Sequence, residues 1–554
     1  MNSLIKQTFA AVLIVIALNA TAFGQTAAKE DVPKGWHLMD KKVNGFYGIS
    51  LDKAYDFVKS KKLKSKTVIV AVIDSGVDTT HEDLKAVLWH NPGEIPGNGI
   101  DDDHNGYVDD VYGWNFLGGK DGKNVEQDSY EGARVYHALK SKWDGKKVDE
   151  STLSKADKDE YEMWKKAKAD VVGDLNPLIY MQLKKIYKDL KVGDSIIRKE
   201  LKKEEYKCSD LESYTPTDDA AIKLKKILTT FCSDNNTTEI SNVEIIDELQ
   251  GELSKAEAVD NAPEPFRNEV VKDNYSDFND RYYGNNDVMA SAKSAMHGTH
   301  VVGIIGADRN NNIGIKGIAD NVKIMMVRAV PDGDEHDKDI ALAIHYAVDN
   351  GAQVINMSFG KSFSPEKQWV DEAVKYAESK GVLLVHAAGN DAKDLDTTDN
   401  FPSPVFKADG KRAGNWITVG ASGDSLADGL VAGFSNYGKQ EVDVFSPGVK
   451  IYSSVPTGNQ YQNLQGTSMA SPVVAGVAAL ILEYFPDLSP QQVKMVIEKS
   501  VQKTGKVKNP ETGEDVDFST LSRSGGIINA YEAVKLASTL KGERIKQPAA
   551  KKPF

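Results

Sequence analysis

The sequence predicts an α/β protein in which helices cover both faces of a parallel sheet and a large, mostly helical insertion interrupts the chain. Short apolar, β-branched runs recur through the C-terminal half, and helical patterns separate several of them. Strands that are apolar on both faces and alternate with helices are typical of parallel sheets. A stretch dense in Lys, Glu and Asp, without strand signals, predicts the insertion at residues 120–288.

The elements of the predicted sheet can be placed along the chain. The helix predicted last has a well-marked start, with Ser489 as N-cap, Pro490 at the first helical position and Gln492 completing a capping box. Such sheets carry their sites beyond the carboxyl ends of the strands. The predicted strands are residues 68–73, 322–330, 353–357, 382–387, 416–419 and 442–445. The predicted helices are residues 338–349, 365–379, 467–484 and 490–503, with 155–169 and 178–190 in the insertion.

The composition excludes several classes of protein. The chain has 554 residues, 81 acidic and 68 basic side chains and a formal net charge of −13. Because a nucleic-acid binder normally shows a basic face, we expect no nucleic-acid partner. With 40% hydrophobic and 27% charged residues, the chain has the composition of a soluble globular protein. The sequence leaves the oligomeric state open.

The two ends of the chain differ from the rest. Residues 1–25 have a lysine, an apolar run at 9–18 and small residues at 20–22, which is the pattern of a secretory signal peptide. The run is too short to span a bilayer of about 30 Å, although a core helix is an alternative. We therefore expect an exported protein, secreted, periplasmic or on the cell surface, without a membrane span. Residues 26–66 are predicted to be an extension that packs on the main domain, and residues 540–554 a flexible basic tail.

The chain has two cysteines, Cys208 and Cys232, and both lie in the insertion. In an oxidising compartment outside the cytosol they can form a disulfide. Two buried free thiols are the alternative.

Three segments place a reactive side chain at the end of a strand or the start of a helix. Asp74 follows an apolar strand, His297 opens a helix rich in small residues, and Ser468 opens a long apolar helix. Each alone has a structural interpretation: a turn carboxylate, a core histidine and an N-cap. His297 and His300 could suggest a metalloenzyme, but the zinc-peptidase helix pattern needs a glutamate that is missing here.

The helix position of Ser468 favours chemistry on an oxygen. Backbone N–H groups and the positive end of the helix dipole lie beside a side chain at this place, where a developing oxyanion is stabilised. Asn390 follows another apolar strand and offers a side-chain amide donor.

Asp74, His297 and Ser468 occur in the chain order of the subtilisin triad. With the segments 356–360, 434–438 and 445–448, the sequence resembles the subtilisin-like serine peptidases, or subtilases, over residues 67–119 and 289–539. The resemblance implies a subtilisin-like catalytic domain in these two pieces. It also implies an exported serine endopeptidase that needs no cofactor for catalysis and has proteins or peptides as substrates. A catalytically silent peptide-binding module on the same fold is the rival interpretation.

The resemblance also implies roles for single residues. Ser468 would be the nucleophile, His297 the general base and then acid, and Asp74 the carboxylate that orients His297. Asn390 and the N–H of Ser468 would form the oxyanion hole. The bound peptide would run as an added strand beside one segment, while a second segment walls the specificity pocket. These substrate-binding residues would be Ser358, Phe359 and Gly360, and Ala387, Ala388 and Gly389.

Two acidic loops are candidates for structural calcium. Residues 101–110 resemble the start of an EF-hand loop, although position 12 is Tyr112 instead of the bidentate glutamate. A plain acidic surface turn is the alternative. The second loop, 310–314 with Asp83 and Asn311, looks like a calcium site of some subtilases, but Arg309 counts against it. The predicted ligands of the first loop are Asp101, Asp103, Asn105, Asp109 and Asp110.

Overall fold

The structure is a computed structural model that describes residues 32–173, 177–203, 205–234, 241–426 and 429–544. The chain divides into two compact units, residues 1–128 with 265–554 and residues 129–264. The predicted signal peptide and residues 545–554 of the predicted tail lie outside the described residues.

The first unit is built on a seven-stranded sheet with the strand order β2-β3-β1-β4-β5-β6-β7. Every pair of neighbours in it is parallel, which confirms the predicted fold class. In β1 and in β3, every position but one is buried. This burial explains why both runs are mostly apolar. The strands are β1 (Val68–Asp74), β2 (Gly113–Asn115), β3 (Val322–Arg328), β4 (Val354–Met357), β5 (Leu383–Ala387), β6 (Trp416–Ser422) and β7 (Val444–Pro447).

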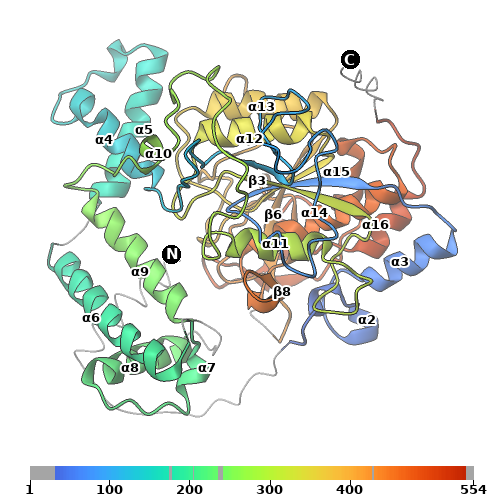
Figure 1. Cartoon of the computed structure of the whole chain (residues 1–554), viewed down its shortest axis with the longest axis horizontal. Helices are drawn as coiled ribbons and strands as arrows, with labels where there is room; N and C mark the ends of the chain where they lie inside the picture. The colour runs from blue at the N-terminus through green and yellow to red at the C-terminus, as the bar shows by residue number, and fades with distance from the viewer. Residues whose placement is uncertain (1–31, 174–176, 204, 235–240, 427–428, 545–554) are drawn as a thin grey trace. The chain divides into compact units, whose positions relative to one another are not determined.

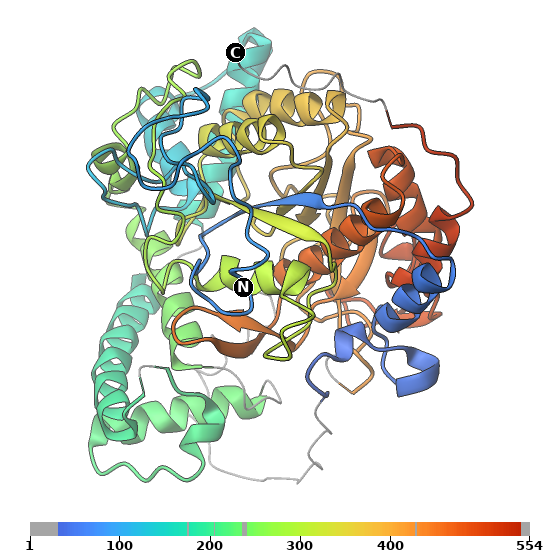
Figure 2. The ribbon, with the colours of Figure 1, turned by 45° about the vertical axis from the view of Figure 1, so that its right-hand side comes forward.

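Helices cover the sheet on both faces (Figures 1 and 2). One face carries α12 (Asp337–Asp349) and α13 (Lys367–Ser379), which pack on each other and on the strands. The other face carries α11 (Met296–Gly306), α14 (Thr467–Tyr484), α15 (Pro490–Lys499) and α16 (Ala530–Ala537). Two antiparallel hairpins complete this unit, β8 (Ile451–Val455) with β9 (Gln460–Leu464), and β10 (Lys506–Lys508) with β11 (Asp515–Asp517).

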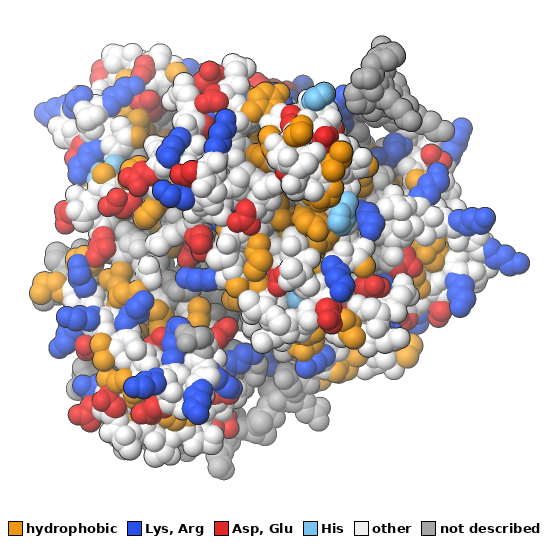
Figure 3. Space-filling view, in the orientation of Figure 1, with side chains coloured by type: hydrophobic (Ala, Val, Ile, Leu, Met, Phe, Trp, Pro, Cys, Tyr) orange, Lys and Arg blue, Asp and Glu red, His pale blue; other side chains and the backbone are white. Residues whose placement is uncertain are grey.

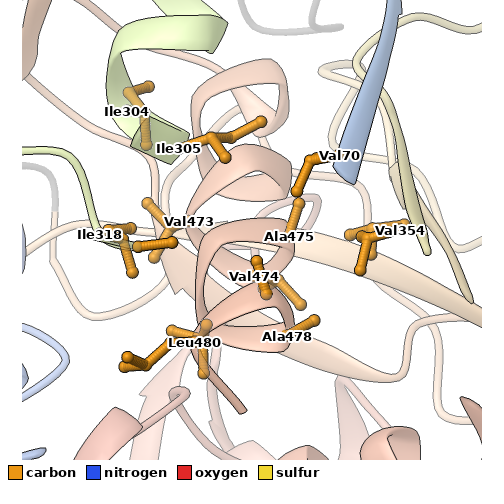
Figure 4. Packing of buried hydrophobic residues seen from close by; sticks show 14 of the residues in the cluster. Val70, Ile304, Ile305, Ile318, Val354, Val473, Val474, Ala475, Ala478 and Leu480 are labelled. Carbon is orange, nitrogen blue, oxygen red and sulfur yellow. The ribbon is translucent and has the colours of Figure 1, made fainter. Parts of the chain in front are cut away.

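Helix α14 is the core of the second face. It contacts five strands, β1 and β4 to β7, and it packs against α11. Figure 4 shows Val474 and Ala475 of α14 among side chains from β1, β4 and α11. This helix is long and apolar enough to cross a membrane, but 89% of it is buried inside the protein, as in the core helix of a globular domain.

The segment before β1 packs on the same face. It holds a 3-10 turn (Trp36–Leu38), α2 (Lys41–Asn44) and α3 (Leu51–Ser60). The indole Nε1 of Trp36 donates to the carbonyl of Val449 at 3.0 Å, and Trp36 is fully buried. Helix α3 packs on α16. Residues 32–66 thus contribute to the main core.

The structure refines several predicted boundaries. Helix α14 has the predicted bounds, and α15 has the predicted capping box at Ser489 but ends at Lys499. Strand β2 escaped prediction because three residues are too short for a periodic signal. Residues 120–128 and 265–288, assigned above to the insertion, count with the first unit, where Gln127 pairs with Asp332 and Asn285 with Asn115.

The second unit is helical in its described residues. Cys208 of α7 and Cys232 of α8 form a disulfide bond, and their Cα atoms lie 6.5 Å apart. Both cysteines are buried. Its helices are α4 (Glu131–Trp143), α5 (Lys155–Val172), α6 (Pro177–Leu201), α7 (Cys208–Leu211), α8 (Asp219–Asp234) and α9 (Asn242–Glu257). The short α10 (Phe266–Val270) follows in the first unit.

The charges of both signs are mixed on the surface. Figure 3 shows basic and acidic side chains interspersed over one face, without a large area of one sign.

One buried carboxyl makes the stability of the fold depend on pH. Glu483 near the end of α14 is fully buried, and its Oε1 accepts from the N–H of Asn321 at 2.9 Å. Burial, helped by the nearby charge of Asp320, raises the pKa of Glu483 to about 9. Folding therefore takes up a proton when the pH lies between the unfolded and folded values, and stability falls as the pH rises through this window.

We expect Glu483→Gln to stabilise the protein at pH 8 but not at pH 4. At pH 8 the gain should be at most about 5 kcal/mol, because this pH lies about 3.5 units above the ordinary pKa of 4.5 and each unit is worth about 1.4 kcal/mol. Denaturant unfolding at both pH values measures it, with Glu532→Gln on the surface of α16 as the control. An equal effect of Glu483→Gln at both pH values would contradict the protonated state of this carboxyl.

Candidate active site

The predicted reactive residues meet at one edge of the sheet. Asp74 is the last residue of β1, Ser358 follows β4 and Asn390 follows β5. These three strands are neighbours, so their carboxyl ends lie together. His297 and Ser468 lie in the first turns of α11 and α14, which pack against each other.

Asp74 and His297 form a hydrogen-bonded pair. The Nδ1 atom of His297 lies 2.7 Å from Oδ1 of Asp74. Because a carboxylate only accepts, Nδ1 carries the proton and Nε2 of the neutral ring is left as an acceptor. The N–H of Ser75 donates to the same Oδ1 at 2.7 Å, which holds the carboxylate in place.

The environment of this pair favours a charged imidazole. Burial alone lowers the pKa of His297, but the charge of Asp74 and the hydrogen bond to it outweigh burial and raise the pKa above its usual value. Asp74 is 1% exposed, and its Oδ2 has no hydrogen-bond partner among the described residues. The carboxylate therefore stabilises the protonated ring with little competition.

Ser468 is held against the end of β4 by two reciprocal hydrogen bonds. Its Oγ donates to the carbonyl of Ser358 at 3.1 Å, and the Oγ of Ser358 donates to the carbonyl of Ser468 at 2.9 Å. Ser468 is partly exposed, whereas Thr467 and Met469 beside it are buried. The hydroxyl thus lies at a fixed, reachable place at the start of α14.

Asn390 presents its amide donor in a defined orientation. Its Oδ1 accepts from both the N–H and the hydroxyl of Thr467, each at 2.9 Å. Both groups are donors there, so the oxygen of Asn390 faces Thr467 and Nδ2 faces away. The Oγ1 of Thr467 also accepts from the N–H of Gly389 at 3.0 Å, which links the two segments.

Gly466 leaves open a space between two donors. A β-carbon on this residue would lie 3.5 Å from Nδ2 of Asn390 and 3.6 Å from the N atom of Ser468. The backbone of Gly466 has φ 149°, a conformation that favours glycine. Two N–H donors therefore border one small volume, as the stabilisation of an oxyanion requires. Sequence reasoning assigned no separate role to Gly466 or Thr467, the two residues that precede Ser468.

The two predicted substrate segments are neighbours. Phe359 and Gly360 follow Ser358 beyond β4, while Ala387 ends β5 and leads to Ala388. The Nε2 of His386 donates to the carbonyl of Phe359 at 2.8 Å, which ties the segments together.

Asn400 lies between these segments, and the sequence did not point to it. Its Nδ2 donates to the carbonyl of Ala388 at 3.0 Å. A β-carbon on Gly360 would lie 2.5 Å from Oδ1 of Asn400. Asn400 thus keeps the two backbones apart at a set spacing.

His300 has a role in packing. It is fully buried, and its Nε2 donates to the carbonyl of Gln462 in β9 at 3.2 Å. Burial lowers the pKa of His300 to about 3, so the ring stays neutral. Its proton-carrying nitrogen Nε2 therefore anchors α11 to the hairpin of β8 and β9.

The acidic loop brings together three carboxylates, of which the sequence analysis had predicted two. Glu94, Asp101 and Asp103 have oxygen atoms within 4.8 Å of one another. Glu94 is 8% exposed, and its Oε2 has no hydrogen-bond partner among the described residues. A buried, unpartnered carboxylate oxygen beside two other carboxylates fits a hard cation such as Ca²⁺.

The other predicted ligands of this loop make hydrogen bonds. Asn105 donates from its N–H to Oδ1 of both Asp101 and Asp103, at 3.1 and 3.0 Å. Asp109 accepts from the N–H groups of Gly97 and Gly99 at 2.8 and 2.6 Å. The two oxygens of Asp110 accept from Asn91 at 2.7 Å and from the hydroxyl of Tyr346 at 2.5 Å. Asp109 and Asp110 thus stabilise the loop by hydrogen bonds and are not part of the carboxylate cluster.

The second predicted metal loop is closed by hydrogen bonds. Asp83 is fully buried, and its Oδ1 accepts from Nδ2 of Asn311 at 2.6 Å. Its Oδ2 accepts from the N–H of Ile315 at 2.9 Å and from the hydroxyl of Tyr461 at 3.1 Å. Asp83 and Asn311 do meet, but protein donors occupy both carboxylate oxygens.

Known proteins resemble this chain over the part that holds Asp74, His297, Asn390 and Ser468. A family model described as the Subtilase family matches residues 65–516. A thermophilic serine proteinase of Bacillus sp. (strain AK1) is 41% identical over 241 residues, which are 43% of this chain and 52% of that protein. Subtilisin DY of Bacillus licheniformis is 38% identical over 213 residues, 38% of this chain and 71% of its own length. Thermitase of Thermoactinomyces vulgaris is 36% identical over 240 residues, 43% of this chain and 75% of its own length. The chain thus spans about half the length of the thermophilic serine proteinase.

We expect Asp74→Asn to lower the pKa of His297 below 6.5, its value in the absence of interactions. The substitution removes the charge that outweighs burial, and burial then acts alone. NMR titration of ¹⁵N-labelled histidine measures this pKa, and the pKa of His345 in α12 serves as an internal control. An unchanged or higher pKa of His297 would mean that Asp74 does not set it.

Proposed function

The chain belongs to the subtilase family, and we propose that it is an exported serine endopeptidase that acts through Asp74, His297 and Ser468. The observation that carries the proposal is the space at Gly466 that Nδ2 of Asn390 and the N atom of Ser468 border, at the same edge of the sheet as the hydrogen-bonded pair of Asp74 and His297. A peptide-binding protein has no need of two N–H donors that border one small space beside a serine hydroxyl.

In the proposed reaction, Oγ of Ser468 attacks the carbonyl carbon of the scissile peptide bond. Nε2 of His297 takes the hydroxyl proton, and Asp74 stabilises the imidazolium that results. The carbonyl oxygen becomes an oxyanion between Nδ2 of Asn390 and the N–H of Ser468. His297 then gives its proton to the leaving amine, and an acyl-enzyme remains.

The second half of the reaction reverses these roles with water. His297 takes a proton from a water molecule, which attacks the acyl carbonyl, and returns it to Ser468 as the new carboxyl group leaves. All the groups required are side chains and backbone amides, so the proposed reaction needs no cofactor.

The proposed substrate is an extended protein or peptide segment. It would pair by backbone hydrogen bonds with Ser358, Phe359 and Gly360. The side chain before the cleaved bond would lie against the segment from Ala387 to Gly389. The spacing that Asn400 sets between these two backbones supports this arrangement.

We further propose a structural calcium ion at the acidic loop. Glu94, Asp101 and Asp103 would be its protein ligands, with Asn105 beside them. The unpartnered Oε2 of Glu94 supports this proposal, because an unpartnered carboxylate oxygen is costly to bury without a cation. The ion would stabilise the loop, and it takes no part in the proposed reaction.

Two features support export. The apolar run at residues 9–18 has the length of a signal sequence, and the disulfide between Cys208 and Cys232 is of a kind that persists outside the cytosol.

We expect an organophosphonate to label the protein at Ser468, and Ser468→Ala and His297→Ala to abolish labelling and peptide cleavage. Asn390→Ala should lower kcat by about 10²–10³ with little change in KM, a figure that itself comes from subtilisin. Asn279→Ala, on the surface of the first unit, is the control. A folded protein that binds peptides but is neither labelled nor active would instead be a silent peptide-binding module.

We expect removal of calcium by a chelator to lower the melting temperature, and added Ca²⁺ to restore it. At a calcium concentration about 100 times the Kd, bound ion stabilises by about 2.7 kcal/mol. Glu94→Gln should abolish the response, whereas Asp102→Asn, in the same loop but outside the cluster, should keep it. The same melting temperature with chelator and with calcium would exclude the ion.

A further inference from the structure

Arg328 is a buried cation beside the proposed catalytic pair. It is the last residue of β3 and is fully buried. In the sheet it lies in register with Asp74 of β1 on one side and with Asn115 of β2 on the other. The side chain of Arg328 thus starts from the strand position next to Asp74.

The guanidinium donates only to neutral groups. Its Nε donates to the carbonyl of Ser75 at 2.9 Å, and Nη1 donates to Oδ1 of Asn115 at 3.1 Å. Its Nη2 donates to the carbonyl of Val125 at 2.6 Å and to Oγ of Ser294 at 2.9 Å. No ion pair of Arg328 is found among the described residues, although the charges of Asp287 and Glu126 act on it from a greater distance.

This arrangement differs from that of Arg267, another arginine that is fully buried. Arg267 donates to both carboxylate oxygens of Asp339, at 2.8 and 2.7 Å, and to Asp273 at 2.5 Å. A buried charge with a carboxylate partner is balanced, whereas one without a partner destabilises the fold. Burial lowers the pKa of Arg328 to about 10, so it is still cationic at neutral pH. Because an unpaired buried guanidinium destabilises the fold, the presence of Arg328 at this position requires a reason other than stability.

Each of the two serines that Arg328 contacts lies close in sequence to one member of the Asp–His pair. Ser75 follows Asp74, and its N–H donates to Oδ1 of Asp74 at 2.7 Å. Ser294 precedes His297 by three residues, just before α11. The Oγ of Ser294 also donates to the carbonyl of Ser75 at 3.2 Å. Arg328, Ser75 and Ser294 therefore form one hydrogen-bonded junction between the segment of Asp74 and the segment of His297.

We propose that Arg328 is the positioning residue of the Asp74–His297 pair, and that its guanidinium fixes the separation of the two segments through Ser75 and Ser294. Among the described residues, Arg328 makes no hydrogen bond to the substrate segments after β4 and β5 or to Ser468. Its loss therefore affects the proton-transfer step and leaves peptide binding intact. The inference rests on the proposed peptidase function for its kinetic consequences, but the geometry of the pair can be tested without activity.

The kinetic test compares Arg328→Gln and Arg328→Lys with the wild type on a peptide substrate. We expect Arg328→Gln to lower kcat by about 10²-fold with KM nearly unchanged, because a small displacement of a catalytic group costs about this much. Arg328→Lys keeps the charge and up to three donors, so it should recover about tenfold of the loss. Arg267→Gln, equally buried but away from the site, should lower the melting temperature and leave kcat of the folded enzyme unchanged.

A spectroscopic test is independent of turnover. In the inactive Ser468→Ala background, NMR of ¹⁵N-labelled histidine detects the proton that Nδ1 of His297 donates to Asp74. We expect this strongly downfield signal in Ser468→Ala, its loss or broadening on adding Arg328→Gln, and its return with Arg328→Lys. Arg267→Gln in the same background should keep the signal.

Each result decides one question. A folded Arg328→Gln with the wild-type kcat, or with a raised KM alone, overturns the positioning role, as does an unchanged NMR signal. If Arg328→Gln does not fold, Ser294→Ala tests the same junction, and we expect a three- to tenfold loss of kcat at constant KM; no loss overturns the proposal. A wild-type protein that is not labelled and does not cleave peptides refutes the proposed function, while the NMR result still decides the role of Arg328.

Discussion

The burial of helix α14 is the constraint on which the rest of the structure depends. Its apolar side chains pack across the central strands of the sheet, so the helix cannot shift without opening the core (Figure 4). Its first turn must then lie at the carboxyl edge of β4 and β5. The position of Ser468 is therefore set by packing. The hydrogen bond from Ser468 to Ser358 and that from its neighbour Thr467 to Asn390 add only the final orientation.

Polar groups around this edge are linked to one another by hydrogen bonds. Thr467 holds the oxygen of Asn390 and the backbone of Gly389, while Asn356 bonds Ser358 and Ser471. On the opposite side, Arg328 joins Ser75 to Ser294. Because side chains in such networks have few alternative rotamers, the reactive groups are held before a substrate arrives.

Charges are buried at several places in the first unit, and each is handled differently. Arg267 and Lys338 are matched by Asp273 and Asp339, Glu483 retains a proton, and Asp74 pairs with His297. Arg328 and the Oε2 of Glu94 have no such compensation among the described residues. Uncompensated buried charge is costly to a fold, which is why these two places carry the proposals for a positioning residue and a cation.

The sequence by itself determined the parallel sheet, most of its strands and helices, and the short segments that hold Asp74, His297, Asn390 and Ser468. These follow from local patterns: β-branched runs, capping residues and small residues at helix starts, each read within a few neighbouring positions. Only the tertiary structure decided that Glu94 lies with Asp101 and Asp103. It also decided that Asp109 and Asp110 accept hydrogen bonds from other parts of the protein. The contacts of Arg328 with Ser75 and Ser294 are of the same kind. Those partners are set by how strands and loops distant in sequence pack together. Local propensity carries no information about that packing, since the same loop sequence can close on itself or on a neighbour.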